Sequence, residues 1–303
     1  MRFFIIILIL LCHISKAQKK NDLGIFIYAG GGIDYYTGDL KDNMLPDPNF
    51  ICPFWTVGLD FQINNIFNIG FGYLKGDVLG ADRLGIKNPK RNFKFKSYIK
   101  DYHILAKLNL FNFKGKSRFT PGILFGIGLF KFEPQIFANG VWNDAQTLGT
   151  EGQNLGGNNP TPYSLQSYNS KIGLELTYQI NCKWYLDVYA FYNKTYTDYL
   201  DDVSGTYPDY NQLIASENGA TVANYTYTYY NEYIPTAGTP RGNPTLNDGY
   251  VNIGINLNYK LWGKCQGENG ISKKRNSSCA AYRQKKRYNT HKYRKHRKRA
   301  TRF

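Results

Sequence analysis

The stretch YVNIGINLNYKLW (residues 250–262) indicates the fold more clearly than any other part of the chain. Its odd-numbered positions carry Val, Ile, Ile, Leu, Tyr and Leu, whereas the even-numbered positions between them carry Asn, Gly, Asn, Asn and Lys. Alternation with a period of two is typical of a strand with one apolar and one polar face. The stretch therefore predicts a strand of a membrane β-barrel or of a β-sandwich.

The same alternation predicts seven earlier strands, at residues 23–32, 54–63, 67–75, 97–112, 123–129, 172–179 and 184–191. Short connections near 64–65, 112–117 and 181–182 alternate with long ones at 34–52, 76–96, 132–163 and 199–248. Outer-membrane barrels have this arrangement, with tight periplasmic turns and long external loops. We therefore predict an all-β fold, an eight-stranded antiparallel up-and-down transmembrane β-barrel of the outer membrane. A secreted soluble β protein is the alternative.

The two faces of the predicted strands differ in composition. Aromatic residues near strand ends are typical of the girdles at membrane interfaces: Trp55, Tyr73, Trp184, Tyr259 and Trp262. The opposite faces carry charges of both signs, which are able to pair inside a narrow barrel: Asp60, Asp101, Lys107, Lys171, Glu175, Asp187 and Lys260. The sequence thus predicts a filled lumen rather than an ion pathway.

The termini divide the chain into three parts. Residues 1–17 have a basic start, an apolar run and a small-residue cleavage site, so we expect a signal peptide that is cleaved after Ala17. The barrel occupies residues 18–262 and is neutral overall, whereas the tail at 263–303 carries most of the formal net charge of +16. An even number of strands that starts in the periplasm also ends there, so we expect the tail to be periplasmic.

The tail interleaves cations with Tyr and His residues, a pattern that in a cytosolic protein would indicate nucleic-acid binding. Export places it where nucleic acid is scarce, so an acidic periplasmic protein, anionic lipid headgroups or the cell wall are the expected targets. A solvated charge run without a partner stays open. The candidate partner-binding residues are Lys273, Lys274, Arg275, Lys285, Lys286, Arg287, Arg294, Lys295, Arg297, Lys298 and Arg299.

Four cysteines follow the signal peptide, in a compartment that permits disulfides: Cys52, Cys182, Cys265 and Cys279. They allow three full pairings, and the sequence does not choose among them. The predicted turn at Cys182 lies on the same side of the membrane as the tail, so the predicted topology allows a bridge among the last three.

The final predicted strand carries a second signal. Its residues Asn252, Gly254, Leu257 and Tyr259 follow a polar-x-Gly-x-x-apolar-x-aromatic spacing. This spacing resembles the signal that the outer-membrane assembly machinery reads in the last strand of a barrel.

Catalytic motifs are scarce in the sequence. It contains no HExxH, GxSxG or phosphate-binding loop, so we expect no enzymatic activity, no cofactor and no metal site. His103 is expected to be a hydrogen-bonded interior residue. An acidic cluster at Asp198, Asp201, Asp202 and Asp209 offers oxygen ligands for Ca²⁺, but solvated loop acids or turn caps explain it better because the EF-hand spacing is absent.

Five motifs resemble those of the PorG family, outer-membrane barrels of the type IX secretion system that are linked to gliding motility in some members. They are GGGIDYYTGDL (30–40), FTPGILFGIGLF (119–130), LGTEGQ (148–153), YTDYLDDVSGTY (196–207) and RGNPTLND (241–248). The likeness covers about residues 22–265 and leaves out the basic tail. It implies a non-enzymatic component that associates with a periplasmic ring formed by a lipoprotein and its partner subunit.

The motifs fall largely in predicted external loops, whereas the implied ring is periplasmic. We therefore expect a structural network over the barrel mouth, held by charge-assisted hydrogen bonds, with Asp198, Asp201, Asp202, Arg241 and Asp248 as candidates. The expected function is to anchor or organise the ring, with ring subunits and outer-membrane lipid as partners. A stand-alone barrel that binds a ligand or surface partner through its loops is the alternative, and a lipid-modifying enzyme is a third.

Overall fold

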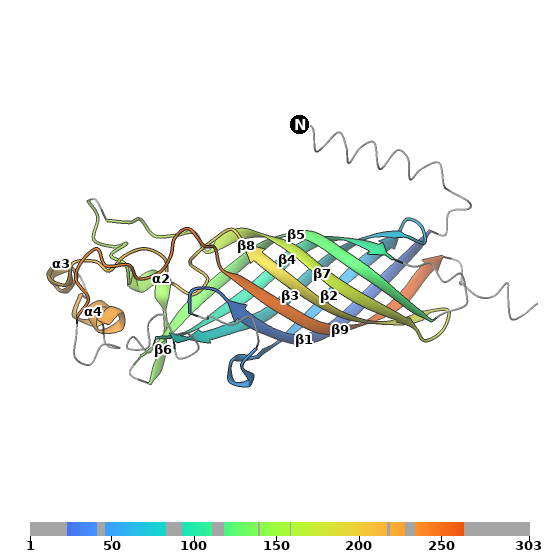
Figure 1. Ribbon diagram of the computed structural model, residues 1–303, viewed down its shortest axis with the longest axis horizontal. Coiled ribbons are helices and arrows are strands. Elements are labelled where there is room, and N and C mark those ends of the chain that lie inside the picture. Colours follow the sequence, from blue (N-terminus) through green and yellow to red (C-terminus); the bar gives the residue numbers. More distant parts are fainter. Residues whose placement is uncertain are drawn as a thin grey trace, which may run out of the picture.

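A computed structural model describes residues 23–40, 46–82, 93–110, 118–138, 140–157, 159–216, 219–227 and 234–263. Eight antiparallel strands pair with their neighbours along the chain and close into a barrel through β1–β9 and β4–β5 pairing (Figure 1). They are β1 (Gly24–Thr37), β2 (Cys52–Gln62), β3 (Phe67–Ala81), β4 (Lys94–Asn109), β5 (Phe119–Ala138), β7 (Gln166–Gln179), β8 (Trp184–Thr195) and β9 (Gly249–Gly263). The predicted eight-stranded up-and-down barrel is confirmed.

The remaining elements lie in the long connections at one end of the barrel (Figure 1). They are a 3-10 turn η1 (Pro48–Phe50), a short strand β6 (Val141–Asp144) that pairs with the end of β5, and the helices α2 (Ala145–Leu148), α3 (Tyr210–Ala215) and α4 (Gly219–Tyr227). Within the described part of the chain, no helix has the length and apolar character needed to cross a membrane. We call the end of the barrel with the long connections the loop end, and the opposite end the turn end.

Tight connections at the turn end are closed by asparagine side chains. Asn64 Oδ1 accepts hydrogen bonds from the backbone N–H groups of Ile66 and Phe67, and Asn181 Oδ1 accepts them from Lys183 and Trp184. Asparagine favours such turns because its side chain imitates a backbone turn. Two of the predicted short turns therefore have a local chemical cause.

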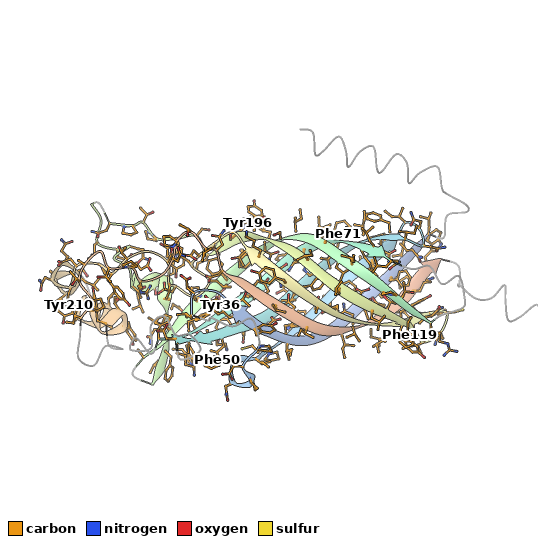
Figure 2. The ribbon with its side chains drawn as sticks, in the orientation of Figure 1. Tyr36, Phe50, Phe71, Phe119, Tyr196 and Tyr210 are labelled. Carbon is orange, nitrogen blue, oxygen red and sulfur yellow. The ribbon has the colours of Figure 1, made fainter. Side chains whose placement is uncertain are left out.

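The part of the barrel between the turn end and the loops has the polarity of a membrane protein, with apolar side chains outside and polar side chains inside. On β7, Ile172, Leu174 and Leu176 are exposed on the outside, whereas Asn252 and Asn258 on β9 are buried inside. Figure 2 shows Phe71 and Phe119 on the outer surface. Outward aromatic rings gather at both ends of this region, with Trp55, Tyr73 and Tyr102 in contact toward the loops, and with Trp184 against Tyr259 and Phe119 against Tyr178 near the turns.

The strands run further toward the loop end than the sequence analysis predicted. For example, β1 continues to Thr37, β3 to Ala81 and β5 to Ala138. In these extensions the polarity is inverted: Phe130, Phe132 and Ile136 of β5 are fully buried inside the barrel, while Lys131 and Glu133 are exposed outside. The predicted strands are too short because the prediction required apolar residues at the outward positions. In the extensions these positions face water instead of lipid and are polar.

The inversion gives the height of the apolar band. On β5 the outward apolar positions run from Phe119 to Leu129, and Lys131 is the next outward residue. Ten residues of strand span about 33 Å along the strand and, at the usual tilt of about 45°, about 23 Å along the barrel axis. This agrees with the apolar band of about 25 Å in outer-membrane barrels.

The barrel separates two of the cysteines. Cys52 begins β2 at the loop end, and Cys182 lies in the β7–β8 turn at the opposite end. The pairing of Trp184 with Tyr259, of Tyr259 with Ile27 and of Ile27 with Leu59 places this turn near Leu59, about 23 Å along β2 from Cys52. A disulfide requires Cα atoms within about 7 Å, so the Cys52–Cys182 pairing is excluded.

Several predicted features lie outside the described residues. These are the signal peptide at 1–17, Cys265, Cys279 and the whole candidate partner-binding tail from residue 264 onward. The barrel itself ends with β9 at Gly263, one residue beyond the predicted boundary at 262.

A charge on the lipid-facing side should destabilise the barrel only inside the apolar band. We predict that L174K lowers the free energy of unfolding from lipid vesicles by about 2–4 kcal/mol, because Leu174 is exposed near the middle of the band. The matched control is Q166K, on the same strand and face but beyond Tyr168. Equal losses in urea titrations followed by heat-modifiable gel mobility would contradict the assignment of this face to lipid.

Candidate functional site

The interior of the barrel is crossed by a polar network close to the loop end. Lys171 Nζ donates to Asp101 Oδ2 at 2.9 Å and to Asn193 Oδ1 at 2.6 Å. From Asn193 the chain of hydrogen bonds continues through Asn252 to Asp34. These residues come from β4, β7, β8, β9 and β1, so one network ties strands across the lumen.

A second polar network fills the lumen nearer the turn end. Lys107 forms an ion pair with Glu175, donates to Thr177 Oγ1 at 2.7 Å and lies 3.9 Å from Asp187. Asn258 Nδ2 donates to Asp187 Oδ2 at 2.9 Å. The predicted pairing of interior charges is therefore found at two separate levels.

An apolar layer separates the two networks. Phe54, Leu74, Leu124, Tyr189 and Phe191 form one buried cluster, with Leu105 packed against it. The inward positions of β4 show the order directly, because Asp101 and His103 precede Leu105, and Lys107 follows it. The interior thus alternates polar, apolar and polar levels along the axis.

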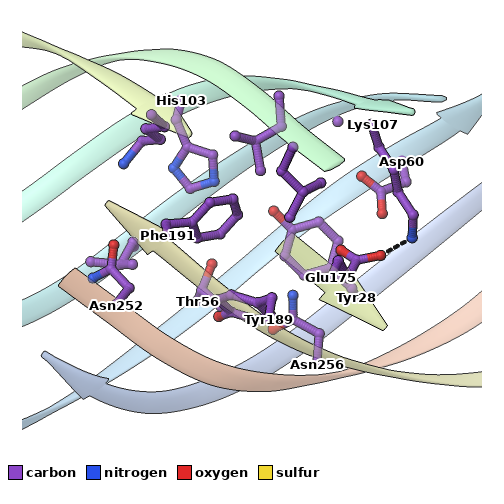
Figure 3. Close-up of a pocket in the computed structure, with 15 residues that line it drawn as sticks. Tyr28, Thr56, Asp60, His103, Lys107, Glu175, Tyr189, Phe191, Asn252 and Asn256 are labelled. Atoms are coloured by element: carbon purple, nitrogen blue, oxygen red, sulfur yellow. Dashed lines mark hydrogen bonds and ion pairs between the residues drawn. The ribbon is translucent and has the colours of Figure 1, made fainter. Parts of the chain in front are cut away.

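A small cavity lies between these levels (Figure 3). Its volume is about 30 Å³, and its lining includes Tyr28, His103, Lys107, Glu175 and Tyr189. His103 Nδ1 lies 3.1 Å from Asp101 Oδ1, which confirms the expected hydrogen-bonded interior histidine. A space of this size holds one or two water molecules and is far too small for a folded or extended polypeptide.

The loop end is closed by the long loops together with the inverted strand extensions, and we call this packed structure the cap. The cap has a hydrophobic core. It combines the inverted strand extensions with loop residues: Tyr36, Leu40, Val78, Phe93, Phe95, Ile99, Phe130, Phe132, Ile136, Ala145, Leu200, Val203 and Tyr250. A second cluster next to it holds α3 and α4 through Tyr207, Leu213, Val222, Ala223 and Tyr227. The long loops therefore form a packed structure over the barrel mouth.

A buried ion cluster joins two of the long loops in the cap, the connection between β5 and β7 and the connection between β8 and β9. Arg241 is 2% exposed; its Nη1 donates to Glu151 Oε1 at 3.0 Å and also to the backbone oxygen of Asp202. Glu151 also accepts hydrogen bonds from the backbone N–H groups of Ser204 and Gly205. Burial raises the pKa of Asp202, and the Arg241 charge opposes that rise. The cluster connects sequence positions 151, 202 and 241.

Two more aspartates of the cap share one phenol. Tyr36 Oη lies 2.6 Å from Asp201 Oδ2 and 2.7 Å from Asp248 Oδ1. A phenol has a single proton to donate, so the second contact requires a protonated carboxyl group that donates to the phenol oxygen. Burial, followed by the charge of Asp201, raises the pKa of Asp248 well above its usual range, which agrees with a carboxyl that keeps its proton.

Asp198 lies close to this pair. Only 7% of it is exposed. Burial, together with the charges of Asp201 and Asp39, raises its pKa to about 8. The five candidate network residues, Asp198, Asp201, Asp202, Arg241 and Asp248, are thus all buried in the cap, in two adjoining groups.

The other candidates have separate places. Asp209 caps α3 by accepting a hydrogen bond from the backbone N–H of Gln212, so it acts as the turn cap that the sequence analysis favoured. Among the described residues, no group of three or more His, Cys, Asp or Glu side chains is arranged to hold a metal ion. Of the proposed assembly signal, Asn252 and Gly254 face the lumen while Leu257 and Tyr259 face outward.

Sequence reasoning missed several residues of the cap. Glu151, Thr150 and Tyr163 contact Arg241 or Asp202, although none was a candidate. The only signal was the position of Glu151 in the LGTEGQ motif, in a loop rich in Gly and Asn. Its partner lies 90 positions away, beyond the reach of local patterns.

Removal of the buried guanidinium should loosen the cap without unfolding the barrel. In R241M, Glu151 and Asp202 remain buried without their cation, at a cost of about 3–5 kcal/mol. We expect faster protease cleavage within residues 140–248, with heat-modifiable mobility retained. The control R118M alters an exposed arginine at the turn end. Unchanged loop protection in R241M would show that the ion cluster does not hold the cap.

The raised pKa values give the cap a defined pH dependence. The folded cap binds protons at Asp198 and Asp248 that the unfolded loops release above about pH 4, so cap stability should fall as pH rises from about 4 through about 8. The double variant D198N/D248N should flatten this decline in protease protection between pH 5 and 9. The control D209N preserves a helix cap and should keep the wild-type profile; a stability that rises with pH would contradict the proton-sharing arrangement.

Comparison with known proteins gives structural likeness only. No protein-family model matches the chain, and no curated protein matches it. Solved structures do match, among them Neisserial surface protein A (11% identity, 80% of this chain and 100% of that chain, TM-score 0.38), Ail of Yersinia pestis (8%, 80% and 100%, 0.34) and a major outer membrane protein from Thermus thermophilus (8%, 79% and 99%, 0.37). Scores this low carry no argument, so the assignment of a transmembrane barrel rests on its strand pairing and its apolar band.

Proposed function

We propose that this protein is a non-enzymatic outer-membrane component of the type IX secretion machinery, which anchors or organises the periplasmic lipoprotein ring of that machine. The specific support is the resemblance of its five motifs to the PorG family. Four of them, at residues 30–40, 148–153, 196–207 and 241–248, contribute to the cap or to the strands that lead into it. Their side chains are occupied with one another, which explains the motifs as structural.

The observation that carries the proposal is the filled lumen. Two polar networks, one apolar layer and the cap occupy successive levels of the barrel, and the cavity among them measures about 30 Å³. A barrel filled in this way is not the conduit for an exported protein. Its contribution to a secretion machine is then to hold other subunits at the membrane.

The periplasmic side offers the contacts for such a role. At the turn end, the short connections leave little surface, and the basic tail follows β9 directly. An excess of Lys and Arg suits an acidic partner, with an attraction that salt screens. We therefore assign the ring-binding role to the turns and the tail, and not to the cap.

Deletion of the tail tests this role without removing any barrel strand. We predict that a chain ending at Gly263 recovers less of the ring subunits in affinity purification from detergent-solubilised outer membranes, and that the remaining association depends less on salt. The matched control is the R241M variant, whose change lies in the cap and should leave recovery unaltered. Heat-modifiable mobility confirms that each variant is folded.

Three outcomes would count against the proposal. Full-length protein that never recovers ring subunits would favour the stand-alone barrel whose loops bind a ligand or surface partner. Equal recovery after tail deletion at every salt concentration would remove the tail from the interface. A change in lipid structure that depends on this protein would reveal an enzyme instead.

A further inference from the structure

Three lysines form a row on the outer surface of the barrel. Lys75 of β3 pairs in register with Lys100 of β4, and Lys100 pairs with Lys131 of β5. All three belong to the outward set of their strands, since Leu74, Ile99 and Phe130 beside them are buried inside. We call these residues the lysine row.

The lysine row lies at the border of the apolar band. The next outward positions toward the turn end, on the same three strands, are occupied by Tyr73, Tyr102 and Leu129. These three residues are also paired in register. Two residues further into the band come Phe71, Ile104 and Ile127, which are 48%, 44% and 65% exposed to the outside. The lysine row lies two residues further along each strand toward the loop end than the last aromatic or apolar outward side chain. This corresponds to about 5 Å along the barrel axis, which is the level of lipid headgroups.

The arrangement is unfavourable for the barrel alone. Directly opposed residues on neighbouring strands have Cβ atoms about 4.5–5.5 Å apart, and like charges in such pairs repel. Only Lys100 is neutralised within the described structure, by Glu133 at 3.2 Å, and those two side chains are 41% and 52% exposed. Lys75 and Lys131 are exposed and form no ion pair with another described residue.

β2 and β7 carry no lysine at the equivalent position, and β8 carries a single one, the exposed Lys194 that follows Tyr192. The first outward residue beyond the aromatic border is Pro53 on β2, after Trp55, and Gln166 on β7, after Tyr168. Of the three strands of the lysine row, only β4 carries further outward lysines toward the loop end. Lys96 pairs with Asp77 at 3.1 Å, and Lys94 lies over the rings of Phe137 and Trp142. Among the described strands, three lysines paired in register therefore occur only on the face formed by β3, β4 and β5.

We propose that the lysine row binds the phosphorylated headgroups of anionic lipids in the outer leaflet of the outer membrane. A phosphate offers several acceptor oxygens, and each is able to take a charge-assisted hydrogen bond from a different ammonium group. Anionic lipid attracts lysines at the surface of a membrane in the same way. The bound phosphate would supply the negative charge that the row lacks, and it would fix the rotational position of the barrel among its lipids. This role is independent of the secretory function.

The test uses purified full-length protein in a zwitterionic detergent, titrated with bisphosphorylated lipid A or with the same lipid after enzymatic removal of its phosphates. Binding is read from the midpoint of heat-modifiable mobility and from lipid adducts in native mass spectrometry. Wild-type protein should be stabilised by the phosphorylated lipid and far less by the dephosphorylated one. Equal stabilisation by both would overturn the proposal, because acyl chains alone would then explain the binding.

The informative variant is K75Q/K131Q, which keeps the Lys100–Glu133 pair. It should bind phosphorylated lipid A about ten- to thirty-fold more weakly than wild type, from the loss of two surface cations. Its stability in detergent alone should be equal or higher, since repulsion with Lys100 is relieved. The matched control R118Q/K183Q removes the same charge at the turn end and should bind normally.

A variant of opposite sign completes the test. E133Q removes the acid that competes with phosphate for Lys100, so it should bind phosphorylated lipid more tightly than wild type. Unchanged affinity in K75Q/K131Q, or an equal loss in R118Q/K183Q, would show that the lysine row is not the binding surface.

Discussion

Each long strand of this barrel passes from hydrocarbon into water, and the change of solvent decides which of its faces is apolar. On β5, Ile127 points to lipid while Gly128 faces the polar network around Asp101; beyond Leu129 the order reverses, with Lys131 outside and Phe132 in the core of the cap. The strand keeps its alternation of side chains throughout, because the backbone geometry does not change. One hydrogen-bonded sheet thus serves as a membrane barrel at one end and as the wall of a water-soluble core at the other.

The rest of the molecule depends on this reversal. Inside the band the polar side chains of the lumen need partners other than bulk water, and the networks around Lys171 and Lys107 supply them to Asp101, Asn193, Glu175 and Thr177. Above the band the inward aromatic residues need a partner, and the loops provide one by folding over them. The buried cluster of Arg241, Glu151 and Asp202 then joins loops that local contacts alone would leave apart. The filled lumen inside the band and the cap beyond it both follow from the change from lipid to water along the strands.

The sequence was sufficient for the parts of the fold that follow from local periodicity. It placed eight strands, the turns at Asn64 and Asn181, and the outward and inward faces within the band. It missed the outer strand ends, because buried Phe95 and Phe130 at inward positions break the pattern expected for lipid. In the cap, Asp201, Asp202 and Arg241 were predicted to act together, yet Glu151 was missed, since pairing between distant loops is set by tertiary folding and leaves no periodic trace.

The position of the solvent border is tested most directly by cysteine scanning along the outward face of β5, in a background without the native cysteines. Single cysteines at positions 123, 125, 127, 129, 131, 133 and 135 would be exposed to a membrane-impermeant maleimide in intact lipid vesicles. The account predicts protection through position 129 and rapid labelling from position 131 onward. Labelling at every position would contradict a membrane-spanning barrel, and protection that extends to position 135 would place the cap, too, in lipid.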